Sequence, residues 1–126
     1  MTSRVQAFHD ERAALNEIVL GRDDLNIKRF FGIDSAVYRE GALPVKTKEL
    51  LGLVGSLVLR CDDCISYHVI RAHEVGVNDQ EFDETMSIGL VIGGSITIPH
   101  LRRAYRMWTE LHPGSKLAAE SPKQEK

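Results

Sequence analysis

The sequence predicts an all-α fold. Its apolar residues recur every three or four positions, which places them on one face of a helix, and they do not alternate as in a half-buried strand. Residues that cap or end helices, mainly Gly, Asp, Asn and Pro, fall between these apolar runs. The 126 residues suffice for one compact domain. We therefore expect a single helical domain over residues 1–112 and a polar, disordered tail over residues 113–126.

The N-terminal part is expected to form three helices. The first would span residues 3–20, with Gly21 as its C-terminal cap. Two shorter helices would follow over residues 24–31 and 34–40, because Gly32 separates them and Asp34 is a good N-cap. The expected buried face of the first helix consists of Val5, Phe8, Leu15, Ile18 and Val19.

The central part is expected to supply the core. Thr47 would cap a helix that runs to residue 59 and is too apolar to be exposed. After a short break over residues 60–62, a second helix would continue to Val75 and stop at Gly76. These two helices carry the residues whose chemistry is most informative.

Two further helices are expected in the C-terminal part. Asn78 and Glu81 resemble a capping box that starts a helix reaching about Ile92. The pair at positions 93 and 94 would end it, and a last helix would begin at Ser95, with Pro99 tolerated in its first turn. The apolar content of segments 47–59 and 86–98 exceeds what one thin layer of helices can cover, which favours a homo-oligomer.

Composition excludes several classes of partner. Sixteen Lys and Arg residues against eighteen Asp and Glu residues give a net charge of −2, too little to attract nucleic acid or an anionic membrane surface. No apolar stretch is long enough to cross a bilayer, and polar residues interrupt any signal-like segment near the N-terminus. We expect a cytoplasmic protein, where nearby cysteines are more often catalytic or metal-binding than structural.

Cys61 and Cys64 are the two cysteines of the chain, and His68 follows four residues later. On a continuous helix this spacing would place all three side chains on one stripe. The helix N-terminus would favour a thiolate at Cys61, and His68 could accept the proton of Cys64. The two cysteines could also form a reversible disulfide, so the pattern indicates either a redox site or a metal site.

Glu49 adds a carboxyl group, either as a surface residue near a helix start or as a buried proton carrier. The order Glu49, Cys61, Cys64 and His68, with eleven, two and three intervening residues, resembles the active-site pattern of the AhpD-like alkylhydroperoxidases. These belong to the wider carboxymuconolactone decarboxylase family. The resemblance extends from about Leu43 through the glycine pair at 93 and 94.

The resemblance implies an all-α domain of about six helices, assembled as a trimer or hexamer, that reduces hydroperoxides without an organic cofactor. Cys64 would attack the peroxide, Cys61 would resolve the sulfenic acid as a disulfide, and His68 with Glu49 would move protons. A thioredoxin-like or lipoylated protein would reduce the disulfide. Asp63 departs from the pattern, because related peroxidases carry a second His there, and the charge of Asp62 and Asp63 opposes thiolate formation.

Two alternatives remain open at the level of sequence. Cys61, Cys64 and His68 could hold zinc in a helical interaction module, with Glu49, His73 or His100 as the fourth ligand, although no second C-x-x-C motif completes the set. A lactone enzyme of the decarboxylase type would not need the cysteine pair. His73 lies off the stripe of His68 and is assigned no catalytic role, and Tyr67 could either line the site entrance or pack.

Overall fold

A computed structural model describes residues 3–113 and confirms the all-α fold. Its helices are α1 (Arg4–Leu20), α2 (Leu25–Val37), α3 (Val45–Leu59), α4 (Asp62–Glu74), α5 (Asp79–Gly93), the 3-10 helix η1 (Ser95–Thr97) and α6 (Ile98–Leu111). Apart from Pro113, the expected tail lies outside the described residues. No helix within the described range is long and apolar enough to span a bilayer.

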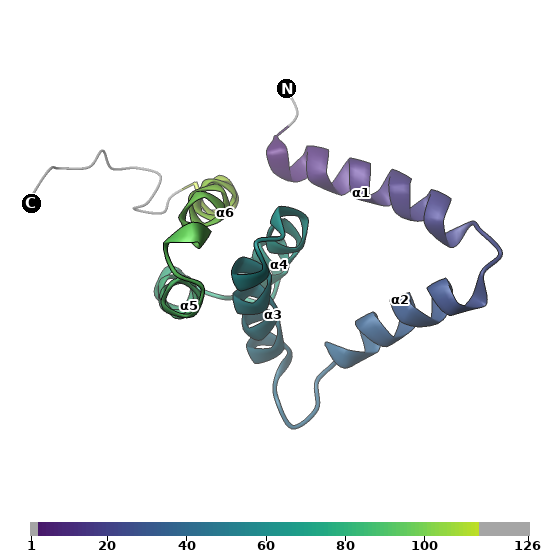
Figure 1. Cartoon of the computed structure of the whole chain (residues 1–126), viewed down its shortest axis with the longest axis horizontal. Helices are drawn as coiled ribbons and strands as arrows, with labels where there is room; N and C mark the ends of the chain where they lie inside the picture. Colours follow the sequence, from purple (N-terminus) through teal and green to yellow (C-terminus); the bar gives the residue numbers. More distant parts are fainter. Residues whose placement is uncertain (1–2, 114–126) are drawn as a thin grey trace, which may run out of the picture.

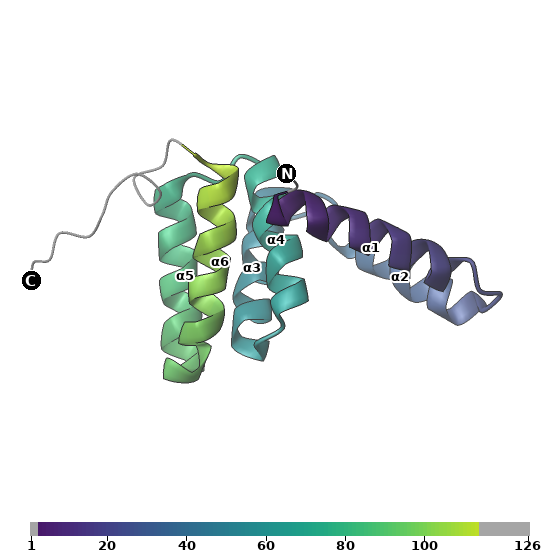
Figure 2. The ribbon, with the colours of Figure 1, turned by 90° about the horizontal axis from the view of Figure 1, so that it is seen from above.

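Helices α3 to α6 form a compact body in which they lie side by side (Figure 2). The body carries the hydrophobic core, where Phe82 of α5 stacks on Trp108 of α6 with ring centroids 4.1 Å apart. The indole Nε1 of Trp108 donates a hydrogen bond of 2.8 Å to Asp79, which satisfies its polar group inside the core. The buried core residues are Leu53, Leu57, Ile65, Val69, Ile70, Ala72, Val77, Phe82, Met86, Ala104, Met107 and Trp108.

Helices α1 and α2 form an arm, residues 4–37, that projects from this body (Figures 1 and 2). Neither helix of the arm contains a fully buried residue. Near the start of α1, Val5 and Phe8 pack against the core, and the Arg4 backbone N–H donates to Glu110 of α6. The arm is therefore attached to the body mainly at its two ends.

The expected buried face of α1 is correct at one end and wrong at the other. Leu15, Ile18 and Val19 are 51%, 65% and 37% exposed. The reason is geometric, because α1 leaves the body after its first turns and, among the described residues, no further layer packs against its second half (Figure 1). Helical periodicity identifies the apolar face but not the surface that covers it.

Two expected helix boundaries are wrong. Residues 25–37 form one continuous helix, because a single glycine inside a helix costs only about 1 kcal/mol and Gly32 does not break it. Helix α3 begins at Val45 after Pro44 rather than after a Thr47 cap, and Pro44 makes no side-chain capping bond. Proline suits a helix start because it lacks a backbone N–H that would otherwise remain unpaired there.

The remaining boundaries agree closely with the local sequence chemistry. Asn78 and Glu81 form the expected capping box at the start of α5. Gly76 has a φ of +86°, which ends the α4 segment in a conformation that glycine adopts easily. Residues 95–97 form a 3-10 turn instead of the first turn of the last α-helix, and Pro99 lies in the first turn of α6.

Candidate functional site

The turn between α3 and α4 places the cysteine pair. Arg60 ends α3 with a φ of +59°, and the Cys61 N–H donates 3.1 Å to the Ser56 carbonyl. Cys61 is the N-cap of α4, so it precedes the helix rather than lying within it. The Cys64 N–H donates 3.2 Å to Cys61 Sγ, which satisfies one of the unpaired groups at the helix start.

Cys61 and Cys64 form a disulfide, with their Cα atoms 5.3 Å apart. Cys64 is exposed, whereas Cys61 is half-buried. A thiolate at Cys61 would receive the Cys64 N–H and the positive end of the helix dipole, both of which favour the anion. One sulfur of the disulfide is therefore accessible at the protein surface.

Glu49 of α3 and His68 of α4 form a buried pair. Glu49 is only 1% exposed, and its Oε1 lies 2.9 Å from Nδ1 of His68. Arg71 Nε donates 3.3 Å to the other carboxylate oxygen, so both oxygens of Glu49 have a partner. Because a carboxylate only accepts hydrogen bonds, His68 Nδ1 donates to Glu49, and Nε2 on the other side of the ring faces Tyr38.

Tyr38 is a site residue that sequence reasoning missed. Its hydroxyl lies 3.5 Å from Nε2 of His68, and the two ring centroids are 5.3 Å apart. Burial, followed by the negative charges of Glu49 and Asp34, raises the pKa of Tyr38 above its usual value. The phenol thus keeps its proton at neutral pH and can donate it toward His68. Tyr38 is thirty residues away in sequence, and no local pattern links it to the imidazole.

Gly52 of α3 permits the close approach of these two rings. A Cβ atom at position 52 would lie 2.6 Å from Cε1 of His68 and 2.7 Å from the Tyr38 hydroxyl. In real structures Cβ contacts do not become this short, so any larger residue would push the rings aside. At Gly52 helix α3 therefore has no side chain, and the rings of Tyr38 and His68 occupy that space.

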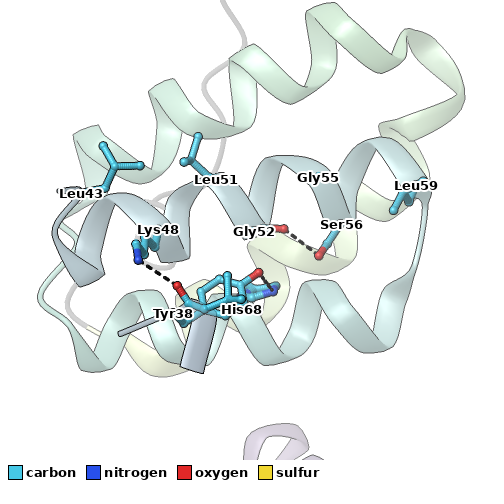
Figure 3. Close-up of a pocket in the computed structure, with 10 residues that line it drawn as sticks. Tyr38, Leu43, Lys48, Leu51, Gly52, Gly55, Ser56, Leu59 and His68 are labelled. Atoms are coloured by element: carbon cyan, nitrogen blue, oxygen red, sulfur yellow. Dashed lines mark hydrogen bonds between the residues drawn. The ribbon is translucent and has the colours of Figure 1, made fainter. Parts of the chain in front are cut away.

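An apolar cavity of about 520 Å³ lies beside Tyr38 and His68. Figure 3 shows these two side chains together next to Gly52, with aliphatic side chains of the α3 segment elsewhere around the cavity. Lys48 Nζ donates to the carbonyls of Val37 and Arg39, which fixes the loop between α2 and α3. The lining residues are Val37, Tyr38, Leu43, Lys48, Leu51, Gly52, Gly55, Ser56, Leu59 and His68.

A second, more polar cavity of about 390 Å³ borders Glu49. Tyr67 lines it and packs edge-on against His68, with ring centroids 5.2 Å apart. The guanidinium of Arg12, on α1, lies 4.3 Å from the centre of the Tyr67 ring. Tyr67 thus lines the second cavity and packs against His68, and its contact with Arg12 connects the arm to the Glu49–His68 pair.

The sequence-predicted residues fall into two groups, one at the N-terminus of α4 and one between α3 and the next turn of α4. Cys61 and Cys64 form one group, and Glu49 and His68 form the other. Within residues 3–113 no hydrogen bond joins Cys64 to His68, and no three His, Cys, Asp or Glu side chains gather as a metal site would require. His73 instead pairs with His112 at 3.0 Å, and His100 contacts Asp62.

Comparison with known proteins extends these observations. The family model for the carboxymuconolactone decarboxylase family matches residues 27–107. An uncharacterised protein of Cupriavidus necator is 29% identical over 65 residues, which cover 52% of this chain and 58% of that protein. An uncharacterised protein of Paracoccus denitrificans is 24% identical over 82 residues, covering 65% and 74% respectively. The chain therefore spans little more than half the length of the first of these relatives.

Solved structures share the arrangement of helices. A carboxymuconolactone decarboxylase family protein of Thermotoga maritima, described with a possible involvement in the antioxidative response, is 58% identical with a TM-score of 0.81. The match covers 85% of this chain and 91% of that protein. A family member from Legionella pneumophila, 20% identical with a TM-score of 0.71 over 85% and 93% of the two chains, shares the fold. The chain belongs to the carboxymuconolactone decarboxylase family.

Proposed function

We propose that this protein is a thiol-dependent peroxidase and disulfide oxidoreductase. The observation that carries the proposal is the Cys61–Cys64 disulfide at the N-terminus of α4, one turn before the buried His68–Glu49 pair. A redox-active disulfide needs accessible sulfur and a proton carrier nearby, and α4 brings both together. The antioxidative description of the Thermotoga maritima protein agrees with this chemistry.

In the oxidation step Cys64 attacks the peroxide. Cys64 is the more exposed cysteine, and His68 follows it by one helical turn. The Cys64 thiolate displaces an alkoxide from the terminal peroxide oxygen and becomes a sulfenic acid. His68 Nε2 takes the thiol proton, through a water or the peroxide itself, and returns it to the alkoxide as the alcohol. Glu49 holds the ring in this orientation and stabilises its protonated form.

In the second step Cys61 attacks the Cys64 sulfenic acid, which forms the disulfide and releases water. A dithiol of a thioredoxin-like or lipoylated protein then attacks Cys64, and Cys61 leaves as a thiolate. A thiol of low pKa leaves faster, and the Cys64 N–H that points at Cys61 Sγ favours that leaving thiolate. We place this cycle in the cytoplasm, where such reductants keep thiols reduced.

The apolar cavity beside His68 supports an organic hydroperoxide as the substrate. Its polar end consists of the imidazole Nε2 and the phenol of Tyr38, while the rest of the wall is largely aliphatic. An alkyl or aryl body would be desolvated there, at about 25 cal/mol for each Å² of apolar surface buried. We therefore expect hydroperoxides with an apolar body to react faster than hydrogen peroxide.

We also propose that the protein works as a homo-oligomer, a trimer or hexamer, in which the arm of one copy covers another copy. Phe30 and Ile33 on the arm are 69% and 62% exposed, and the helices there have no core of their own. On the body, Leu59 and Val91 are 78% and 83% exposed. Helices owe most of their stability to packing of an apolar face, and two such faces on one chain can cover each other between copies.

The oligomer can be tested in solution by sedimentation velocity. The wild type is expected to sediment as a trimer or hexamer, and Phe30→Glu is expected to dissociate it. Lys28→Glu, on the same helix, is the matched control, since Lys28 is an exposed polar residue of α2. A wild-type monomer at micromolar concentration would refute this part of the proposal.

A second candidate function is base catalysis on a small apolar ligand, as in a lactone enzyme. It is favoured by the series of polar contacts from Glu49 to His68 and from His68 to Tyr38. His68 and Tyr38 line a cavity whose lining includes neither cysteine. Such an activity would survive replacement of both cysteines by serine. The peroxidase activity would not survive it.

The decisive experiment treats the reduced protein with one equivalent of cumene hydroperoxide and follows the loss of thiols, with mass analysis of the peptide spanning residues 61–64. The proposal expects rapid conversion of two thiols to an intramolecular disulfide, while Cys64→Ser stays reduced. The Cys61→Ser variant should stop at the sulfenic acid of Cys64, which dimedone traps. Thiols that remain unreactive over many minutes would overturn the peroxidase.

A further inference from the structure

An ion cluster joins α6 to the first residue of α4. Asp62 Oδ1 accepts a hydrogen bond of 2.8 Å from His100 Nδ1, and its Oδ2 accepts 3.1 Å from Arg103 Nε. A second guanidinium nitrogen of Arg103 lies 3.0 Å from the same Oδ2. We name these three residues the α4–α6 clamp. It lies outside the Glu49–His68 pair and has no part in the proton transfer described above.

The position of Asp62 gives the clamp its chemical importance. Asp62 directly follows Cys61 and lies between the two cysteines. A carboxylate without a cationic partner opposes the ionisation of a neighbouring thiol. For this reason the charge of Asp62 is expected to disfavour a thiolate at Cys61. Because both oxygens of Asp62 are bound to cationic or proton-donating groups of α6, the negative charge beside Cys61 is largely neutralised.

The titration of Asp62 is consistent with this neutralisation. Partial burial alone acts to raise the pKa of Asp62, but hydrogen bonds from His100 and Arg103, together with their charges, outweigh it and lower the pKa. The carboxylate therefore stays ionised at neutral pH and keeps its partners.

We propose that His100 and Arg103 are positioning residues that neutralise Asp62 and thereby set the reduction potential of the Cys61–Cys64 pair. The inference rests on the proposed dithiol–disulfide cycle and names the groups that regulate it. The clamp acts only on the equilibrium in which the disulfide takes up two electrons and two protons from an external dithiol. Positive charge near Cys61 stabilises the thiolate of the reduced form, so it shifts this equilibrium toward the dithiol.

The inference predicts shifts of opposite sign for the two halves of the clamp. Asp62→Asn removes the negative charge and leaves the Arg103 guanidinium, so it should shift the equilibrium toward the dithiol. Arg103→Gln and His100→Gln each remove one of the two partners of the carboxylate, so they should shift it toward the disulfide. A unit charge near an exposed sulfur should change the equilibrium constant by about three- to tenfold. Tenfold corresponds to about 30 mV for this two-electron couple.

The experiment equilibrates the full-length protein with glutathione redox buffers at pH 8 and counts its free thiols by mass after alkylation. Arg103→Lys keeps the charge and should stay within about twofold of the wild type. Lys46→Gln is the matched control, because it breaks an ion pair of similar exposure with Glu81, away from the cysteines. Raising the salt concentration should shrink the shifts, since exposed charges are screened.

A merely structural clamp would give a different result. Each substitution would then loosen the same contact between α4 and α6, and all three variants would shift the equilibrium in the same direction. The size of these shifts would not depend on the salt concentration. Shifts of one sign, or shifts no larger than that of Lys46→Gln, would overturn the inference. Circular dichroism of each variant shows whether it folds. If Arg103→Gln does not fold, the equilibria of Arg103→Lys, His100→Gln and Asp62→Asn are compared instead.

The outcome is independent of peroxide turnover, because the reduction potential is an equilibrium property of the cysteine pair. Opposite shifts in a protein that fails to reduce cumene hydroperoxide would support the clamp and overturn only the peroxidase. If the protein reduces the peroxide but its reduction potential is the same in all three variants, the inference about the α4–α6 clamp is refuted and the proposed function is not.

Discussion

Gly52→Ala tests whether α3 must leave space for the rings of the buried site. The new Cβ would lie 2.6 Å from Cε1 of His68, 2.8 Å from its Nε2 and 2.7 Å from the Tyr38 hydroxyl. Contacts this short cannot persist, so at least one ring has to move. The imidazole is tied to the buried Glu49 carboxylate at 2.9 Å, and moving it strains that bond.

The magnitude follows from two opposing effects. Replacing glycine by alanine inside a helix normally stabilises a protein by about 1 kcal/mol. Overpacking a filled site costs about 1–3 kcal/mol. Gly52→Ala should therefore be between neutral and about 2 kcal/mol destabilising. Because displacement of His68 disturbs its alignment with the reacting sulfur, we expect the rate of oxidation by cumene hydroperoxide to drop by about tenfold or more.

Gly55→Ala is a control on the same helix. Nothing lies within 4 Å of a Cβ atom built there, so only the helix propensity should act. Urea denaturation of the two variants and the wild type gives the free energies of unfolding, and Gly55→Ala should be about 1 kcal/mol more stable than the wild type. If Gly52→Ala were stabilised equally and kept its oxidation rate, the close approach of the two rings to α3 would be refuted.

Three further expectations address the site and the clamp. Tyr38→Phe keeps the ring but removes the donor to the imidazole, and it should slow oxidation of the thiols by about tenfold with less than about 1.5 kcal/mol lost in urea unfolding. Glu49→Gln leaves Arg71 without its buried anion and His68 without the carboxylate that orients it, and it should cost about 3–5 kcal/mol in unfolding free energy and abolish the fast oxidation phase. The lowered pKa of Asp62 means that its stabilising contribution is complete above its unfolded pKa and is lost as the pH falls through the folded value. The stability difference between wild type and Asp62→Asn should therefore begin to shrink as the pH falls below about 4 and disappear below the lower folded pKa, and a difference that grows in acid would contradict this sign.

The features predicted correctly from the sequence depend on chemistry within a few residues. The capping box of Asn78 and Glu81 is one example, because both of its hydrogen bonds lie within one turn. Pro99 is another, since proline is tolerated only in the first turn of a helix. The break before α4 is a third, where residues 60 and 61 leave the helical conformation.

The features that sequence reasoning missed depend on contacts between distant segments. Tyr38 reaches His68 from the end of α2, and His100 reaches Asp62 across thirty-eight positions. The helix predicted for α1 is correct, but no segment within residues 3–113 buries Leu15 and Ile18. A single glycine is also a weak guide to a helix end, because its cost of about 1 kcal/mol is small, as continuous α2 through Gly32 illustrates.

Helix α4 separates two chemical tasks by a single turn. Its N-terminus presents Cys64 to solvent, where a bulky protein reductant can reach the sulfur. Its next turn carries His68 into the interior, where Glu49 fixes the ring and an apolar cavity adjoins it. In the proposed cycle His68 would serve the oxidation from the buried side, while the reductant would reach Cys64 at the surface. The α4–α6 clamp would tune the potential of the disulfide from outside the Glu49–His68 pair.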